Sequence, residues 1–291
     1  MARLIPNDET LRLFVPQQVV HVKGETALFD KIARWLDTAE QWLSDNITSA
    51  PTLNRIAEYS DGHPLLRACR AAVAHRALAD AIPSLDLVQT VNGFAVVSNQ
   101  NLAPASRDRV DRLIAAHRSQ CDSAISALIP LLADAHAWRG SPQCEFFRAT
   151  LFQPKHIISL SPLRLSACRL HSKNPQSSQW DKYRELHPAI VNAEAALAAR
   201  YISHGLMQRL RDAALGLNPI STLEARLCEA LRGYVADIVC DRPLRDEALR
   251  DIVEYIRNRP DTFPEWHRSE TARLFSPPVF RNRKDAKGYW F

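Results

Sequence analysis

The feature that most constrains the fold is a helical spacing of apolar residues that recurs along the chain. Between Ala27 and about Ile47 the apolar positions fall at intervals of three and four and share one helix face: Leu28, Ile32, Trp35, Leu36, Ala39, Trp42 and Leu43. Similar patterns predict helices over 64–83, 106–134, 188–215, 222–239 and 245–258. Only 8 of the 291 residues are glycine, which weakens a helix by about 1 kcal/mol relative to alanine. We therefore expect a mainly α protein built as a helical bundle.

One stretch departs from this pattern. Asn92 and Gly93 stand between two runs rich in β-forming residues, and an Asn-Gly pair tolerates the positive φ angles of a tight hairpin turn. The sequence therefore predicts a small β-hairpin near 87–98. A lone hairpin is marginally stable, so we expect it to pack on the helices or to pair with another chain. Phe94 is accordingly a candidate partner-binding residue.

Two pairs of segments indicate that the bundle consists of two duplicated halves. Residues 102–106 (LAPAS) and 217–221 (LNPIS) share Leu-x-Pro-x-Ser before a predicted helix, and residues 128–154 can be aligned with 251–277. Ser106 and Ser221 are candidate N-caps, and Ser221 with Glu224 forms a capping box. The alternative is that proline and serine punctuate unrelated helices in the same way.

These signals divide the chain into five parts. We expect an N-terminal arm (1–24), a first helical half that carries the hairpin (25–154), an irregular connector (155–187), a second helical half (188–277) and a basic-aromatic C-terminal tail (278–291). The arm contains a candidate short strand, QQVVHV, and the connector a second one, HIISLSPLRLS. The start of the chain lacks an apolar signal core, and no apolar run approaches the ~20 residues that span a bilayer.

No constellation in the sequence indicates a catalytic chemistry. The closest histidine arrangements, His63 with His75 and His187 with His204, do not have metal-ligand spacing, and neither a nucleophile motif nor a glycine-rich phosphate loop occurs. We expect no enzyme activity, no cofactor and no metal. The six cysteines form no C-x-x-C pair, so we expect buried, reduced thiols in a reducing, cytoplasmic setting.

The chain is mildly basic, with 37 Lys and Arg against 32 Asp and Glu. This net charge of +5 is compatible with transient proximity to DNA. Arg107, Arg109 and Arg112 alternate with acidic residues, which is typical of a solvated helix face and leaves a phosphate or partner contact as the alternative. Four tryptophans, Trp138, Trp180, Trp266 and Trp290, fall in loops or near helix ends, where they either belong to the core or form interfaces.

The tail ends in three aromatic residues, Tyr289, Trp290 and Phe291, after a proline pair and a cationic stretch. Burying aromatic surface stabilises by about 25 cal/mol per Å², so we expect these residues to dock on their own chain or on a neighbour. With the nearby Phe280 they are the candidate partner-binding residues.

The segment LDLVQTVNGFAVVSNQNLAPASRDRVDRLI (85–114) and the terminal YWF resemble a family of uncharacterised proteins encoded in phage structural gene clusters of Bacteroides-type bacteria and their phages. The resemblance covers nearly the whole chain and carries no assigned reaction. Its context and helical pattern are similar to phage head–tail connector or head-completion proteins, which assemble as rings between portal and tail.

The resemblance implies a virion structural protein, made in the bacterial cytoplasm and then built into the particle. Its partners would be copies of itself in a ring and the portal or tail proteins, without contact to a membrane. The alternative is a cytoplasmic helical binding module without catalysis, associated with nucleic acid through Arg107, Arg109 and Arg112.

Overall fold

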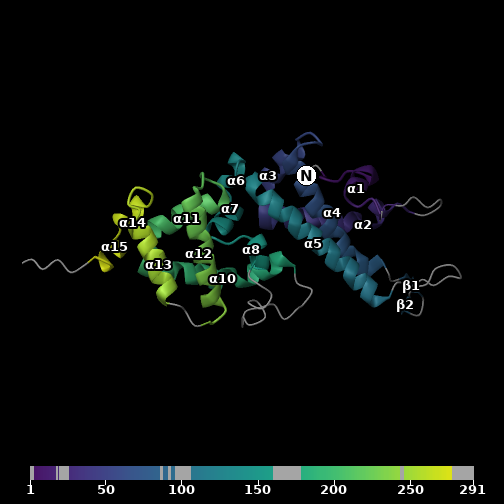
Figure 1. The fold of residues 1–291 in the computed structure, drawn as a ribbon. Coiled ribbons are helices and arrows are strands. Elements are labelled where there is room, and N and C mark those ends of the chain that lie inside the picture. The colour runs from purple at the N-terminus through teal and green to yellow at the C-terminus, as the bar shows by residue number, and fades with distance from the viewer. Residues whose placement is uncertain are drawn as a thin grey trace, which may run out of the picture.

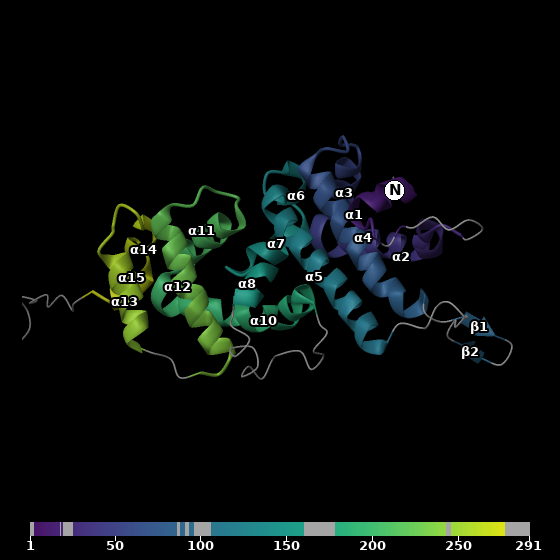
Figure 2. The ribbon, with the colours of Figure 1, turned by 45° about the vertical axis from the view of Figure 1, so that its right-hand side comes forward.

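The computed structural model of the chain describes residues 3–17, 19, 26–85, 88–90, 93–95, 106–159, 178–242 and 246–276. In these ranges the protein is mainly helical, as expected. Its helices lie in two groups along one long axis, with α1 to α5 at one end and α12 to α15 at the other (Figures 1 and 2). None of the helices in these ranges combines the length and the apolar character that a membrane span requires.

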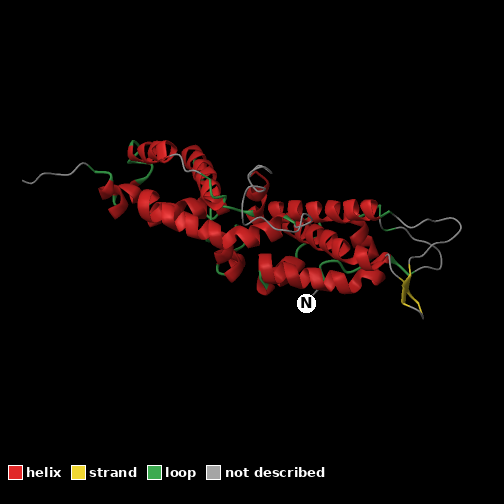
Figure 3. Cartoon of the chain, turned by 90° about the horizontal axis from the view of Figure 1, so that it is seen from below, coloured by secondary structure: helices red, strands yellow, loops and turns green. Residues whose placement is uncertain are grey.

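We call the first group the N-terminal half. It contains α1 (Asp8–Phe14), α2 (Leu28–Leu43), the π-helical turn η1 (Ser44–Thr48), α3 (Ala50–Ala57), α4 (Pro64–Leu85), α5 (Arg107–Leu132), α6 (His136–Arg139) and α7 (Pro142–Arg148). The C-terminal half contains α8 (Pro154–Ser159), α10 (Gln179–Leu197), the π-helical turn η2 (Ala198–Ile202), α11 (His204–Leu215), α12 (Thr222–Val239), α13 (Asp246–Arg257), α14 (Pro264–His267) and α15 (Glu270–Leu274). Seen from below, the molecule has the same elongated arrangement of helices (Figure 3).

The β structure of the described residues is minimal. Strand β1 (Val88–Thr90) pairs antiparallel with β2 (Gly93–Ala95), with Gln89 opposite Phe94. Thr90 lies opposite Gly93, so the glycine of the predicted turn pair belongs to a strand. Within the described ranges the two strands together contain only six residues and add no layer to the helices, so we describe the fold as helical.

Several boundaries differ from the sequence-based expectations. The N-terminal arm contains a helix, α1, which Asn7 caps by accepting a hydrogen bond from the backbone N–H of Thr10. The expected irregular connector contains α8 and the first nine residues of α10, because α10 begins at Gln179 and carries Pro188 in its interior. The expected strand over 156–166 is helical as far as Ser159, and the remainder lies outside the described residues. Pro130 also lies inside its helix, α5.

The two halves repeat one set of contacts, the first of which fixes a non-helical segment against two helices. In the N-terminal half, Leu4 donates its backbone N–H to the buried carboxylate of Glu40 at 2.7 Å, while its carbonyl accepts from Arg70 at 2.7 Å. In the C-terminal half Leu151 does the same, with Glu194 at 2.8 Å and Arg232 at 2.9 Å.

The second shared feature is the end of α2 and of α10. Each helix widens into a π-helical turn and then reaches a serine, Ser49 or Ser203, with φ of 72°. Side chains with a Cβ rarely adopt such a backbone, since positive φ favours glycine. Both halves have this unfavourable backbone conformation directly after the π-helical turn, which is strong evidence that the two segments are equivalent.

The third shared feature is a tryptophan that closes each half. Trp138 donates its indole N–H to the carbonyl of Ile47 at 2.7 Å, and Trp266 donates to that of Tyr201 at 2.7 Å. Each accepted carbonyl lies in a π-helical turn, and a serine hydroxyl, Ser141 or Ser269, donates to the backbone carbonyl of the tryptophan. All three described loop tryptophans are core residues, because Trp138, Trp180 and Trp266 are at most 2% exposed.

The repeat is therefore structural, but its register differs from the one read from the sequence. Ser106 precedes α5 and Ser221 precedes α12, whereas the contacts above match α12 with α4. The buried positions of these two helices agree in order: Leu65, Leu66, Cys69, Val73 and Ala74 match Leu227, Cys228, Leu231, Val235 and Ala236. The Leu-x-Pro-x-Ser match was therefore misleading, since proline and serine begin helices that are not equivalent.

Five cysteines, at 69, 121, 144, 228 and 240, are buried free thiols, as expected. Burial raises the pKa of Cys69 and of Cys121 to about 12, so both remain protonated. Cys168 lies outside the described residues.

Candidate functional site

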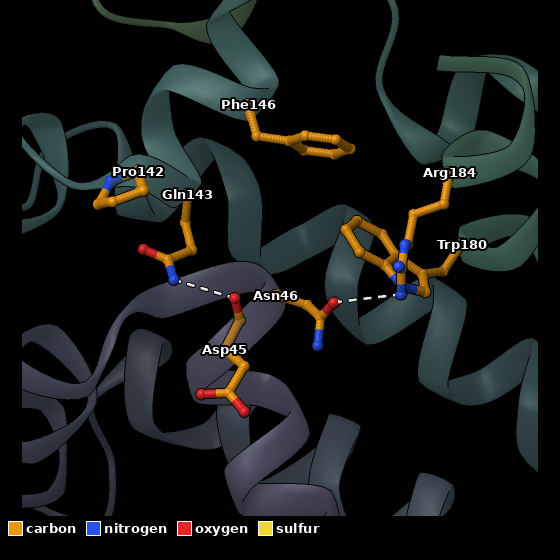
Figure 4. A pocket seen from close by; sticks show the side chains of 7 residues that line it. All are labelled: Asp45, Asn46, Pro142, Gln143, Phe146, Trp180 and Arg184. Carbon is orange, nitrogen blue, oxygen red and sulfur yellow. Dashed lines mark hydrogen bonds between the residues drawn. The ribbon is translucent and has the colours of Figure 1, made fainter. Parts of the chain in front are cut away.

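The candidate site is a cavity of about 240 Å³ at the junction of the two halves. Seven residues line it: Asp45, Asn46, Pro142, Gln143, Phe146, Trp180 and Arg184. They come from η1, α7 and α10. Figure 4 shows Gln143 on one side of the cavity and Trp180 with Arg184 on the other, while Phe146 lies opposite Asn46.

The π-helical turn forms one wall of this cavity. A π turn shifts backbone carbonyls out of the regular helical hydrogen-bond pattern, and such turns are frequent at functional sites. The side-chain amide of Gln143 donates to the carbonyl of Asp45 at 2.9 Å, which holds α7 against the end of α2 (Figure 4). The Asp45 carboxylate accepts from Gln41 at 2.8 Å, on the side of the turn away from the cavity.

Aromatic rings form the opposite wall. The ring of Phe146 stacks on His187 with centroids 3.9 Å apart and an interplanar angle of 12°, and its edge meets Tyr183 at 5.8 Å. His187 also contacts the carbonyl of Phe146 through Nε2 at 2.9 Å. Trp180 of the C-terminal half contacts two rings of the N-terminal half, lying 6.0 Å from Phe146 and 5.8 Å from Trp42. The junction is therefore a packed aromatic contact, which fixes the orientation of α10 against α2 and α7 and also buries apolar surface.

Polar groups without partners lie at the edge of this aromatic contact. Trp180 is 2% exposed, yet within the described part of the chain its indole N–H has no hydrogen-bond acceptor and the side-chain oxygen of Gln143 has no donor. Arg184 is exposed, and its guanidinium lies 3.5 Å from the amide oxygen of Asn46. Because buried polar groups are usually paired, the indole N–H of Trp180 and the guanidinium of Arg184 can donate to a carbonyl or carboxylate from a bound group, and the Gln143 oxygen can accept from an N–H or O–H of that group.

The two halves are also joined by charged groups. The guanidinium of Arg148 on α7 donates to both oxygens of Asp212 on α11, at 2.6 and 2.9 Å. This bidentate ion pair lowers the pKa of Asp212 against the effect of its partial burial. Buried Asp122 on α5 accepts from the backbone N–H groups of Gln179 and Trp180 at the start of α10. Burial raises the pKa of the Asp122 carboxyl to about 6, although these two hydrogen bonds act in the opposite direction.

A histidine pair lies between α4 and α5 in the N-terminal half. The Nδ1 atoms of His75 and His117 are 3.0 Å apart, and Nε2 of buried His117 has no hydrogen-bond partner among the residues that the structure describes. Burial and then the proximity of His117 lower the pKa of His75 to about 4. The described ranges hold no group of three or more His, Cys, Asp or Glu side chains that could bind a metal ion.

Of the candidate residues that the sequence singled out, those within the described ranges do not line this cavity. Phe280, Tyr289, Trp290 and Phe291 lie outside the described residues, and Phe94 lies in β2. Arg107, Arg109 and Arg112 are exposed on the first turns of α5. Arg107 lies 3.8 Å from Asp111, and Arg112 pairs with Asp108, so this face is salt-bridged as the solvated-face interpretation predicts.

The sequence interpretation missed Phe146 and Arg184 as junction residues. A local signal for the helix that carries Arg184 was present, because Ser178-x-x-Asp181 is a capping box and both of its reciprocal hydrogen bonds form. No local pattern identifies Phe146, whose ring contacts Trp180, Tyr183 and His187 on α10.

Residues 19–148 match a family model described as a family of unknown function (DUF6712). The matched range ends at the last residue of α7 and so covers most of the N-terminal half. It includes the η1 and α7 walls of the cavity but not Trp180 or Arg184. Searches of curated proteins and of solved structures gave no match to the chain.

Proposed function

We propose that this chain is a structural protein of a phage or prophage particle, acting as a head–tail connector or head-completion adaptor. It works by assembling with other protein chains and not by catalysis. It is made in the bacterial cytoplasm, and its partners are copies of itself in a ring and the portal or tail proteins.

One observation carries this proposal: the two halves share their internal contacts but associate through different surfaces. The N-terminal half contributes α5 and α7 to the junction, whereas the C-terminal half contributes α10 and α11. Association of similar units through unlike surfaces is head-to-tail, which is the geometry from which rings and tubes are built. The match of most of the N-terminal half to a family without an assigned reaction is compatible with this role.

The aromatic tail supplies a second contact in this proposal. Tyr289, Trp290 and Phe291 dock on an adjacent chain, tethered by the basic segment before them. Large aromatic side chains supply much of the binding energy in protein interfaces. The nucleic-acid alternative has no specific structural support, because Arg107 and Arg112 each lie beside an aspartate of their own helix.

The experiment measures mass in solution for the chain alone and with the portal and tail proteins encoded beside it. The proposal expects a defined complex with at least one of them. A chain that stays monomeric at high concentration and binds none of them would overturn the proposal, as would neighbouring genes unrelated to particle assembly.

The role of the tail is tested by deleting residues 286–291. We expect the truncated chain to lose assembly and to keep its thermal stability. The matched control replaces Lys284 and Lys287 with serine, which alters the tail but keeps its aromatic residues. Normal assembly combined with a melting temperature several degrees lower would show that the tail docks on its own domain.

A further inference from the structure

We propose that a second copy of this chain docks its α2 face on the η2–α15 face of the first, repeating between chains the junction that the two halves form within one. This inference rests on the proposed role in assembly and names the surfaces that assembly uses. The repeated contacts supply the correspondence, because Glu40, Ser49 and Trp138 match Glu194, Ser203 and Trp266.

The apolar part of the correspondence starts from Phe146. This residue stands five positions after Ser141, and Leu274 stands five positions after the matching Ser269. Phe146 is held in the aromatic contact of the junction, whereas Leu274 is 72% exposed. Isolated exposed leucines are common, but this one occupies the position from which its counterpart enters a neighbouring unit.

The receiving face has a counterpart on α2. Tyr183 and His187, which contact Phe146, correspond to Phe29 and Ala33 when α10 is aligned on α2 through Glu194 and Glu40. Phe29 and Ala33 are both partly exposed. In the proposed contact, Leu274 of one copy packs against Phe29 and Ala33 of the other. Leucine is smaller than phenylalanine and alanine is smaller than histidine, so the apolar surfaces remain compatible in size.

The polar part of the correspondence is complementary in charge. Within the chain, Arg184 of α10 reaches Asn46 of η1. The counterpart of Asn46 is Arg200, three residues before Ser203, and the counterpart of Arg184 is Asp30, ten residues before Glu40. Arg200 and Asp30 are exposed, and neither has an ion-pair partner within the described ranges. A weak contact inside one chain therefore becomes a possible ion pair between two chains, which favours this register.

Other junction contacts are not repeated. Arg148 and Asp212, which join the halves, correspond to Ser276 and Glu58, so the contact between copies lacks that clamp. The contact between copies is thus weaker than the junction within one chain. Because each copy carries both faces, it closes into a ring or continues as a filament.

The test is a charge exchange on the full chain, read by sedimentation over a range of concentrations. Arg200→Glu alone and Asp30→Arg alone each place like charges at the contact, and we expect each to weaken self-association at least about tenfold. The chain with both substitutions restores the opposite charges and should recover most of the association. Matched controls are Arg107→Glu and Asp111→Arg, which make the same changes of net charge on α5.

The apolar contact is tested in parallel. Leu274→Ser should weaken self-association, whereas Ile220→Ser, at an exposed apolar residue in the loop before α12, should not. Circular dichroism checks that each variant is folded.

Two results would overturn this inference: a wild-type chain that does not self-associate, or single charge variants that behave like the α5 controls. The outcomes also separate it from the proposed function. A chain that binds portal or tail proteins without self-association keeps the function and loses the inference, and charge-dependent self-association without those partners does the reverse.

Discussion

Asp122 and Gln179 are 57 residues apart in sequence and meet where the two halves join, with the carboxylate Oδ2 accepting the backbone N–H of Gln179 at 2.7 Å. The same carboxylate receives the N–H of Trp180 at 3.4 Å. A side chain of one half therefore satisfies the free N–H groups at the start of a helix in the other half, where a negative charge is also favoured by the helix dipole.

Replacing this carboxylate should weaken the folded chain. We expect Asp122→Ala to lower the free energy of unfolding by about 1–2 kcal/mol, the usual cost of losing a helix cap. Asp122→Asn keeps one acceptor and should cost less. Urea unfolding followed by circular dichroism measures both, with Asp111→Ala on the same helix as the control. Equal effects of the asparagine and alanine variants would contradict the capping role.

The buried ion pair of the C-terminal half should be more sensitive. Glu194 is 0% exposed and accepts from Arg211 at 2.8 Å, and burial raises its pKa although Arg211 opposes this. Arg211→Met leaves a buried carboxylate without its cation, and we expect a loss of about 3–5 kcal/mol. Adding Glu194→Gln removes the charge and should recover part of that loss. An additive double variant in urea unfolding would show that the two side chains do not interact.

The histidine pair predicts how stability depends on pH. His75 has a folded pKa of about 4, below its ordinary value of 6.5, so the unfolded chain binds this proton more readily. The contribution of this group to stability is therefore present above about pH 6.5 and is lost as the pH falls towards 4. We expect His75→Gln to show a smaller decrease in melting temperature between pH 7 and pH 4.5 than the wild type. Exposed His136→Gln is the control, and a pH dependence identical to that of the wild type in both variants would refute the assignment.

The two positive-φ serines should respond differently to glycine. Ser49 has φ of 72° and ψ of 151°, a conformation that only glycine adopts readily, and its side chain accepts no backbone N–H of α3, although its hydroxyl shares a hydrogen bond with that of Thr52 at 2.9 Å. We expect Ser49→Gly to stabilise the chain by up to about 1 kcal/mol, because relief of strain exceeds the added entropy of the unfolded chain. Ser203 has the same backbone, but its hydroxyl accepts from the backbone N–H of Leu206 at 3.3 Å, so Ser203→Gly should gain less. Thermal unfolding of both variants decides, and a larger gain at Ser203 would contradict this reasoning.

The helical nature of the chain could be predicted because its signals are local. The helix expected over 222–239 has the observed bounds, since Ser221 and Glu224 form the capping box and the apolar residues follow at helical spacing. The start of α10 was misplaced because Pro188 looked like a first-turn residue, although a proline can be accommodated inside a long helix.

The junction could not be predicted, because its contacts join residues far apart in sequence. Nothing next to Phe146 indicates that it stacks on His187, and nothing next to Asp122 indicates the helix that it caps. The repeat was recognisable only in part for a related reason. Its strongest signature is a pair of tryptophans, each followed three residues later by a serine, and their shared role depends on carbonyls in distant π-helical turns.

These tryptophans also affect how the chain folds. The hydrogen bond from Trp138 reaches a carbonyl 91 residues earlier, and that from Trp266 one 65 residues earlier. Contacts of such sequence separation form late, because most of the intervening chain must be ordered first. During synthesis, the N-terminal half cannot reach its final packing until Trp138 has left the ribosome. A chain stalled while Trp138 is still inside the ribosome would therefore expose a set of helices with an open end, and a chain stalled after Trp138 has emerged would carry a closed one.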